Sequence, residues 1–182
     1  SLSHPYIVGY QESFHEKQTN KLWLVLELLK GGDLIQMIDR HQKAKTFVPE
    51  KDLFRYFAQT LEGLRELHSK GIIHCDIKPG NIMLTEDLKS AKLVDFNVAT
   101  TKKELASDER MGTSSYAAPE ILSGKPYNQK SDIYSLGVTF FELASHRDPF
   151  AEKEPGKQQS EKRREEFEKT NFSSFQHPQT QE

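Results

Sequence analysis

The sequence has one cysteine, no long apolar run and no signal-peptide core. Cys75 cannot form an internal disulfide, and the chain has no CxxC pair or His/Cys cluster of the kind that binds zinc. The longest apolar run, residues 22–26, is far too short to span a bilayer, and residues 1–5 are not apolar enough for a leader. We therefore expect an intracellular, cytoplasmic protein with no membrane span.

The sequence also lacks an excess of charge of either sign. It has 25 Lys and Arg against 27 Asp and Glu, which gives a formal net charge of −2. Proteins that bind nucleic acid or anionic membranes through overall charge are usually strongly basic. Nucleic acid is therefore not an expected partner, and the composition leaves the oligomeric state open.

Apolar residues are unevenly distributed. Hydrophobic residues make up 35% of the chain, but residues 151–182 contain only Ala151, Phe167, Phe172 and Phe175. Segments this polar and charged rarely bury a core. We expect residues 1–150 to form the domain and residues 151–182 to form a charged polar tail that is disordered or a solvated helix.

The first half of the chain predicts a hairpin followed by two helices. Residues 6–14 and 22–28 are apolar stretches on either side of a polar turn, which is typical of paired strands. A short helix is predicted over residues 33–41 and a longer one from Pro49 to Gly71. We expect the longer helix to bury a stripe at helical spacing, namely Leu53, Phe57, Leu61, Leu64 and His68.

The second half predicts small strands around loops, and then a buried helix. Residues 72–73, 82–84 and 92–94 are short apolar pieces bounded by polar or turn residues. Residues 95–120 are mostly polar and small, which is typical of a long loop that is functional or disordered. Residues 131–144 are apolar on almost all sides, which predicts a buried helix. The fold class expected is α+β.

One polar loop carries the residues that phosphoryl transfer requires. Residues 74–81 place Asp76, Lys78 and Asn81 directly after a predicted strand, and Asp95 follows 14 residues after Asn81. Phosphoryl transfer needs a carboxylate to orient a hydroxyl, a cation near the phosphoryl group and oxygen ligands for magnesium. This loop is therefore the candidate active site.

These motifs resemble those of the eukaryotic protein kinases. Residues 74–81 resemble the catalytic loop, residues 95–97 resemble the DFG element, and residues 118–120 are the APE element. Taken singly, His74 could be a core histidine, Asp95 a strand-end cap and Pro119 a helix start. Several motifs in this order favour the kinase family over those separate explanations.

The resemblance implies a domain organisation. Residues 1–150 would form part of a kinase domain with a kinase-like α+β fold. Residues 1–28 would be the end of the smaller lobe, with its last hairpin and the start of the hinge. Residues 29–150 would be the larger, mainly helical lobe, ending with the helix whose Asp132 steadies the catalytic loop.

The resemblance also implies roles for the polar residues. Asp76 would orient the acceptor hydroxyl and Lys78 would neutralise the γ-phosphoryl group, while Asn81 and Asp95 would hold Mg²⁺. Lys78 and Thr113 follow the serine/threonine-specific pattern rather than the tyrosine-specific one. The activity implied is an ATP-dependent protein serine/threonine kinase whose substrate is a protein hydroxyl.

A second set of residues would bind the ATP nucleoside. By this resemblance Leu26 would be the gatekeeper, and Glu27 and Leu29 would lie in the hinge. Asp33 would contact the ribose, and Met83 would form the apolar floor under adenine. For Leu26 and Met83, core packing is an equally valid role. Residues 31–34 and 125–132 most resemble the NIMA-related group of kinases.

Two residues depart from the family pattern. Cys75 stands where most kinases have an arginine that pairs with a phosphate on the activation loop, so this switch should be weak or missing. A rival interpretation makes Cys75 a nucleophile or redox sensor. Asn97 replaces the glycine of DFG, which predicts a stiffer loop. Candidate phosphorylation sites are Ser107, Thr113, Ser114 and Ser115.

Other family elements have no counterpart in the sequence. The Gly-rich loop and the Lys–Glu pair of the smaller lobe are expected before residue 1, and the late helices do not resemble residues 151–182. The arginine that usually pairs with Glu120 is unassigned. Two hypotheses therefore stand: a kinase represented by a partial catalytic domain, or a non-catalytic, pseudokinase-like interaction module.

Overall fold

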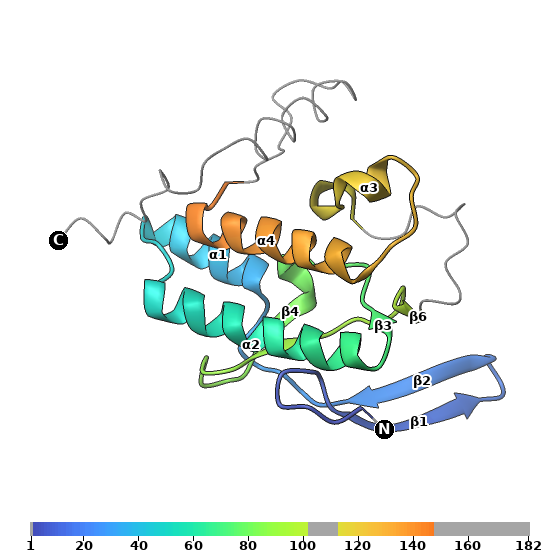
Figure 1. The fold of residues 1–182 in the computed structure, drawn as a ribbon. Coiled ribbons are helices and arrows are strands. Elements are labelled where there is room, and N and C mark those ends of the chain that lie inside the picture. The colour runs from blue at the N-terminus through green and yellow to red at the C-terminus, as the bar shows by residue number, and fades with distance from the viewer. Residues whose placement is uncertain (1, 102–112, 148–182) are drawn as a thin grey trace.

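The computed structural model describes residues 2–101 and 113–147 (Figure 1). Within them the helices are α1 (Leu34–Ala44), α2 (Glu50–Ser69), α3 (Pro119–Leu122) and α4 (Gln129–Ser145). The strands are β1 (Tyr10–Glu16), β2 (Lys21–Leu26), β3 (Ile72–Ile73), β4 (Ile82–Leu84), β5 (Ala91–Leu93) and β6 (Thr100–Thr101). The predicted α+β class is confirmed, and the predicted tail over residues 151–182 lies outside the described residues.

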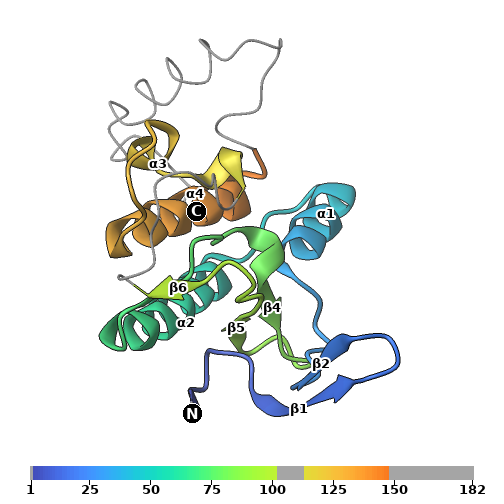
Figure 2. The same cartoon turned by 90° about the vertical axis from the view of Figure 1, so that its right-hand side faces the viewer.

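The described strands form three separate antiparallel pairs, β1–β2, β3–β6 and β4–β5. Figure 2 shows the β1–β2 hairpin beyond the end of β4 and β5, away from the helices. The predicted short strands at 72–73 and 82–84 are confirmed, and the third runs from Ala91 to Leu93. The described part of the predicted long loop contributes β6, which pairs with β3, and the start of the short helix α3.

The hairpin begins later than the sequence predicted. Residues 6–8 do not join β1 but pair with the body of the protein: the Val8 N–H donates to the Leu93 carbonyl oxygen at 2.9 Å, and the Leu93 N–H donates to Tyr6 O at 3.0 Å. Ile7 and Val8 are buried there. The apolar run predicted as one strand therefore divides between a core contact and a solvent-exposed hairpin.

The buried face of α2 is rotated from the predicted stripe. Its buried residues are Tyr56, Thr60, Gly63, Leu64 and Leu67. Leu53 and Phe57 are only partly buried at the edge of the core, and Leu61 is exposed. The apolar surface of α2 is wider than one contact face, so the elements that pack on it decide which residues are covered.

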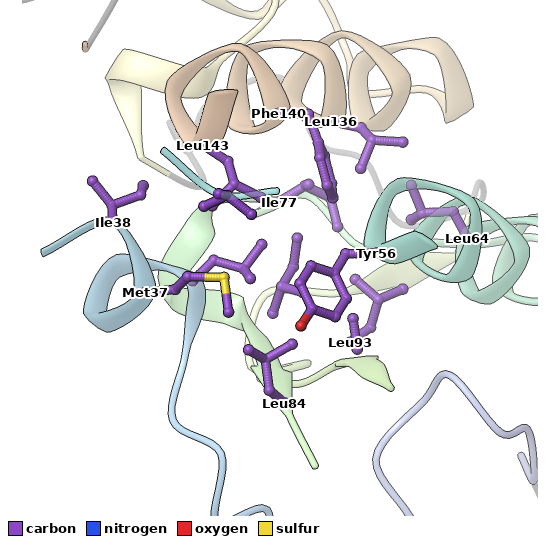
Figure 3. Packing of buried hydrophobic residues seen from close by; sticks show 14 of the residues in the cluster. Met37, Ile38, Tyr56, Leu64, Ile77, Leu84, Leu93, Leu136, Phe140 and Leu143 are labelled. Atoms are coloured by element: carbon purple, nitrogen blue, oxygen red, sulfur yellow. The ribbon is translucent and has the colours of Figure 1, made fainter. Parts of the chain in front are cut away.

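The core lies between α1, α2, α4 and the β4–β5 pair (Figure 3). Leu84 and Leu93 face it from the strands, Tyr56 and Leu64 from α2, and Ile77 from the polar loop itself. Because Ile77 lies between Asp76 and Lys78 and is buried, the core holds the polar loop in place at its midpoint.

Helix α4 starts two residues before the predicted boundary and has a complete capping box. The Asn128 side chain accepts from the Lys130 N–H at 2.8 Å, and the Ser131 hydroxyl accepts from the Asn128 N–H at 3.1 Å. His146 ends the helix with a left-handed backbone. None of the helices in residues 2–101 and 113–147 has the length and apolar character needed to cross a membrane.

The burial of α4 gives a paired test of the core. Leu136 is 1% exposed and Ile133, three residues earlier, is 38% exposed. We expect Leu136→Ala to lower the free energy of unfolding by about 2–5 kcal/mol, because it opens a cavity. Ile133→Ala should cost less than about 1 kcal/mol. Urea denaturation of both variants measures the difference, and equal costs would contradict this packing.

Candidate active site

The polar loop is attached to α4 through one buried carboxylate. Asp132, which is 1% exposed, accepts hydrogen bonds from the backbone N–H groups of His74 at 2.9 Å and Cys75 at 3.0 Å. Its Oδ2 also lies 2.8 Å from His68 Nε2 on α2. A buried carboxylate is costly unless it is well paired, and here three nitrogen groups surround it. The start of the loop is therefore tied to both long helices.

Cys75 adopts a left-handed backbone conformation, with φ of 67°. Non-glycine residues rarely adopt this region, so the surrounding structure must stabilise it. The hydrogen bond from its N–H to Asp132 contributes that stabilisation. Its thiol is buried and lies 3.6 Å from Ile73 O, and burial raises its pKa to about 12. The thiol is therefore protonated at neutral pH.

The side chains of Asp76, Lys78, Asn81 and Thr113 meet in one hydrogen-bond network. Oδ1 of Asp76 accepts from the Thr113 N–H and hydroxyl, both at 2.9 Å. Oδ2 accepts from Asn81 Nδ2 at 2.9 Å and from Lys78 Nζ at 2.6 Å. Lys78 also donates to the Thr113 hydroxyl at 2.9 Å. Three residues from two distant segments thus orient the carboxylate of Asp76.

This network determines the ionisation of Asp76. Partial burial raises its pKa, but the Lys78 ammonium and the donors of Thr113 outweigh burial, so the pKa is held below its usual value. Asp76 is therefore a carboxylate at neutral pH. A carboxylate of low pKa is a weak base at rest and a good hydrogen-bond acceptor, which suits a group that orients a hydroxyl.

His74 connects the loop to the strand that precedes Asp95. Its Nδ1 accepts from the Asp76 N–H at 3.4 Å and its Nε2 lies 3.1 Å from Val94 O. These partners require a neutral ring with the proton on Nε2, in agreement with burial, which lowers the pKa of His74. The ring also lies 5.1 Å from that of Phe96. His74 is thus a packed, hydrogen-bonded core residue.

Asn81 and Asp95 are the two predicted metal ligands. Asn81 is buried and donates through Nδ2 to both the backbone and the side chain of Asp76, which leaves Oδ1 out of those bonds. Asp95 is exposed, and the Val94 N–H before it donates to Asn81 O at 3.1 Å. The residues described contain no cluster of three or more His, Cys, Asp or Glu side chains suited to a metal. Oxygen donors such as these suit Mg²⁺, which usually keeps several waters and phosphate oxygens as its other ligands.

In the segment of residues 95–97, which resembles DFG, the residue with a strained backbone is Asp95 and not Asn97. Asp95 has φ of 63°, whereas Asn97 does not occur among the described residues with positive φ. The Asn97 N–H donates to Asp95 Oδ1 at 3.3 Å. Asn97 therefore adopts no left-handed backbone in this conformation, and the stiffer loop expected from its replacement of glycine stays a prediction.

The five predicted nucleoside-binding residues lie on the hairpin, on the segment after it and on β4. Leu26 is exposed at the end of β2 and Leu29 is buried. Asp33 forms an isolated bridge with Met83, and its carboxylate caps α1 by accepting from the Gln36 N–H at 2.8 Å. No hydrogen bond or ion pair between described residues joins these five to the network around Asp76. They form a second, adjacent set.

The segment between β2 and α1 approaches β4 closely. The Gly31 N–H donates to Leu84 O at 2.9 Å, and the Leu84 N–H donates to Gly32 O at 2.8 Å. A Cβ at Gly31 would lie 2.3 Å from Thr85 O, so a side chain there would force the backbone apart. Glycine at this position permits the close pairing.

A family model described as the protein kinase domain matches residues 1–182 of this chain. The chain belongs to the protein kinase family. The motifs that suggested the family are the ones brought together here, the polar loop and the segment from Asp95.

Several serine/threonine kinases of the Nek group are similar to this chain. "Probable serine/threonine-protein kinase nek2" of Dictyostelium discoideum is 37% identical over 153 residues, covering 82% of this chain and 36% of that protein. "Serine/threonine-protein kinase nekl-2" of Caenorhabditis elegans is 38% identical over 151 residues (78% and 41%). Human "Serine/threonine-protein kinase Nek5" is 39% identical over 151 residues (82% and 21%). The NIMA-related resemblance is confirmed, and the chain spans less than half the length of these relatives.

Two contacts that the sequence analysis did not predict lie near this candidate site. Ser131, in the first turn of α4, donates its hydroxyl to Glu120 Oε1 at 2.8 Å, so Glu120 has a partner other than arginine. Lys92 lies 2.6 and 2.7 Å from the two oxygens of Glu27. Ser131 lies in the stretch of residues 125–132 that resembles the NIMA-related group, but its contact with Glu120, like the Lys92–Glu27 pair, is revealed only when separate segments pack together.

The environment of Cys75 predicts an unreactive thiol. Because the thiol is buried and its pKa is about 12, we expect it to react with a disulfide reagent at pH 8 at least about a hundredfold more slowly in the native protein than in urea. As this is the only cysteine, the absorbance change reports it directly. Equal rates would instead support the nucleophile or redox-sensor interpretation.

Proposed function

We propose that this chain provides the catalytic residues of a protein serine/threonine kinase, which transfers the γ-phosphoryl group of ATP to a protein hydroxyl. The observation that carries the proposal is the network in which Asp76 is oriented by Lys78, Asn81 and Thr113. A chain that served only as a binding surface would have no physical need to keep these four groups in mutual contact.

Asp76 would act on the acceptor hydroxyl. As an ionised carboxylate of lowered pKa, it would hold the hydroxyl by accepting its hydrogen bond. The hydroxyl oxygen would bond to the γ-phosphorus as the bond from that phosphorus to the ADP oxygen breaks, and the hydroxyl proton would pass to Asp76. Lys78, within reach of Asp76 and Thr113, would counter the negative charge on the transferred group.

Serine and threonine are the acceptors that this arrangement favours. Lys78 donates to the hydroxyl of Thr113, which in turn donates to Asp76. This chain of bonds is the serine/threonine-specific pattern identified in the sequence. It holds the segment at residue 113 against the catalytic carboxylate, where an incoming peptide would lie.

Asn81 and Asp95 would hold Mg²⁺, which would neutralise charge on the ATP phosphates when bound. The fit rests on their donor chemistry: an amide oxygen outside the Asn81–Asp76 bonds and an exposed carboxylate. The adenosine would lie over Met83, next to the backbone of Glu27 and Leu29, with Leu26 at the back and Asp33 near the ribose. We propose an intracellular, cytoplasmic setting.

Cys75 should make activation by phosphate pairing weak or missing. A buried thiol stands in place of the guanidinium that would bind a loop phosphate, so residue 75 supplies no positive charge to couple phosphorylation to order. Thr113 and Ser115 remain candidate phosphorylation sites. The other two predicted phosphorylation sites, Ser107 and the side chain of Ser114, lie outside what the structure describes.

Binding of nucleotide is the first prediction of this proposal. Mg²⁺ and ATP at about a hundredfold over the dissociation constant should stabilise the fold by about 2.7 kcal/mol and raise its melting temperature. Asp95→Ala should remove the metal-dependent part of that shift. Asp39→Ala, an exposed carboxylate on α1, is the matched control and should keep it. A cooperative melt with no shift in the unaltered chain would favour the non-catalytic interaction module.

Turnover provides the second prediction. Asp76→Asn keeps the shape of the side chain but removes the charge that orients the hydroxyl. We expect kcat to fall by about 10²–10⁴-fold, with the dissociation constant for ATP unchanged within about twofold. Phosphate incorporation into a serine/threonine peptide mixture measures the rate, with Asp39→Asn as control. An Asp76→Asn variant with normal kcat would exclude the role assigned to this residue.

A further inference from the structure

Lys92 lies on the side of β5 that faces the hairpin. Its neighbours Ala91 and Leu93 are fully buried in the core, so strand alternation directs the Lys92 side chain to the opposite side. Its partner across the β4–β5 pair is Met83. Lys92 is therefore next to the residue proposed to lie beneath adenine, although no kinase motif contains it.

The Lys92 ammonium binds both oxygens of Glu27. Nζ lies 2.6 Å from Oε1 and 2.7 Å from Oε2, and the lysine side chain is only 15% exposed. Oε2 of Glu27 also accepts from the Gly9 N–H at 3.0 Å, while the Glu27 N–H donates to Gly9 O at 2.7 Å. Burial raises the pKa of Glu27, but Lys92 and the Gly9 N–H outweigh it and the pKa is lowered. Glu27 is therefore a carboxylate at neutral pH.

These contacts make β5 the attachment point of the hairpin. Leu93 holds the chain before β1 through backbone bonds to Tyr6 and Val8, and Lys92 holds the chain after β2 through Glu27. Figure 2 shows the hairpin extending past the end of β5. Two consecutive residues of one strand thus hold both ends of the hairpin, one by its backbone and the other by its side chain.

We propose that Lys92 is a positioning residue that fixes the hinge backbone at Glu27 relative to Met83. The part of the inference that concerns nucleotide rests on the proposed function: adenine would need the hinge edge and the apolar floor at a set separation. A bidentate, largely buried ion pair resists the tilting of the hairpin that would change this separation. Lys92 would thereby set nucleotide affinity without touching the nucleotide.

The hinge part is tested on the 182-residue chain without nucleotide. Amide hydrogen exchange, read by NMR, should become at least about tenfold faster at Gly9 and Glu27 in Lys92→Met, because the loss of a coupled, buried partner frees that end of the hairpin. The core amide of Leu64 should exchange as before. Lys92→Arg, which can also bind both oxygens, should restore slow exchange.

Lys30→Met is the matched control. Lys30 also pairs with a glutamate near the hinge, Glu86 at 3.3 Å, but both side chains are mostly exposed (57% and 75%). Exposed pairs contribute little, so exchange at Gly9 and Glu27 should not change. Unchanged exchange in Lys92→Met, or equal acceleration in Lys30→Met, would overturn the proposal.

The nucleotide part is tested by titration with Mg²⁺ and ATP. In Lys92→Met the dissociation constant and KM should rise by about tenfold while kcat stays within about twofold, and Lys92→Arg should restore affinity. Faster exchange with unchanged affinity would overturn the link to nucleotide. If the unaltered chain binds no nucleotide, the proposed function fails, and the exchange measurements still decide whether Lys92 fixes the hinge.

Discussion

The buried carboxylate of Asp132 is the contact on which the rest of the site depends. It lies in the first turn of α4, yet it accepts the backbone N–H groups of His74 and Cys75 and contacts His68 on α2. These bonds use backbone N–H groups, which every residue except proline supplies, so the position of the loop follows from the position of the helix. The packing of α4 on the core therefore determines where the polar loop lies.

The polar network follows from that placement. After the two residues bound by Asp132, the loop buries Ile77 in the core. The residues on either side of it, Asp76 and Lys78, contact each other outside the core. Thr113 closes the network from a distant segment. The site is therefore built from charges that are paired with one another before any ligand binds, which lowers the cost of holding them in one geometry.

Much of this arrangement was predictable from local sequence. The α+β class, the short strands and the polar loop follow from apolar periodicity and turn residues, which act over a few neighbours. The predicted buried face of α2 was wrong at Leu61, because the apolar surface of this helix is wider than the face that contacts the core. In the segment of residues 95–97 the left-handed residue is Asp95, which the sequence did not single out for its backbone. Both features depend on tertiary packing.

The sequence by itself determined which chemistry this protein carries: the carboxylate, the ammonium and the amide of the polar loop are close in the chain, and their spacing identifies the kinase family. The resemblance pointed to Asp132 and Thr113, but only the tertiary structure decided which atoms they contact, and it alone revealed the Lys92–Glu27 pair. All three join segments that are remote in sequence. Contacts of this kind depend on how helices and strands pack in three dimensions, and packing leaves no fixed spacing in the chain.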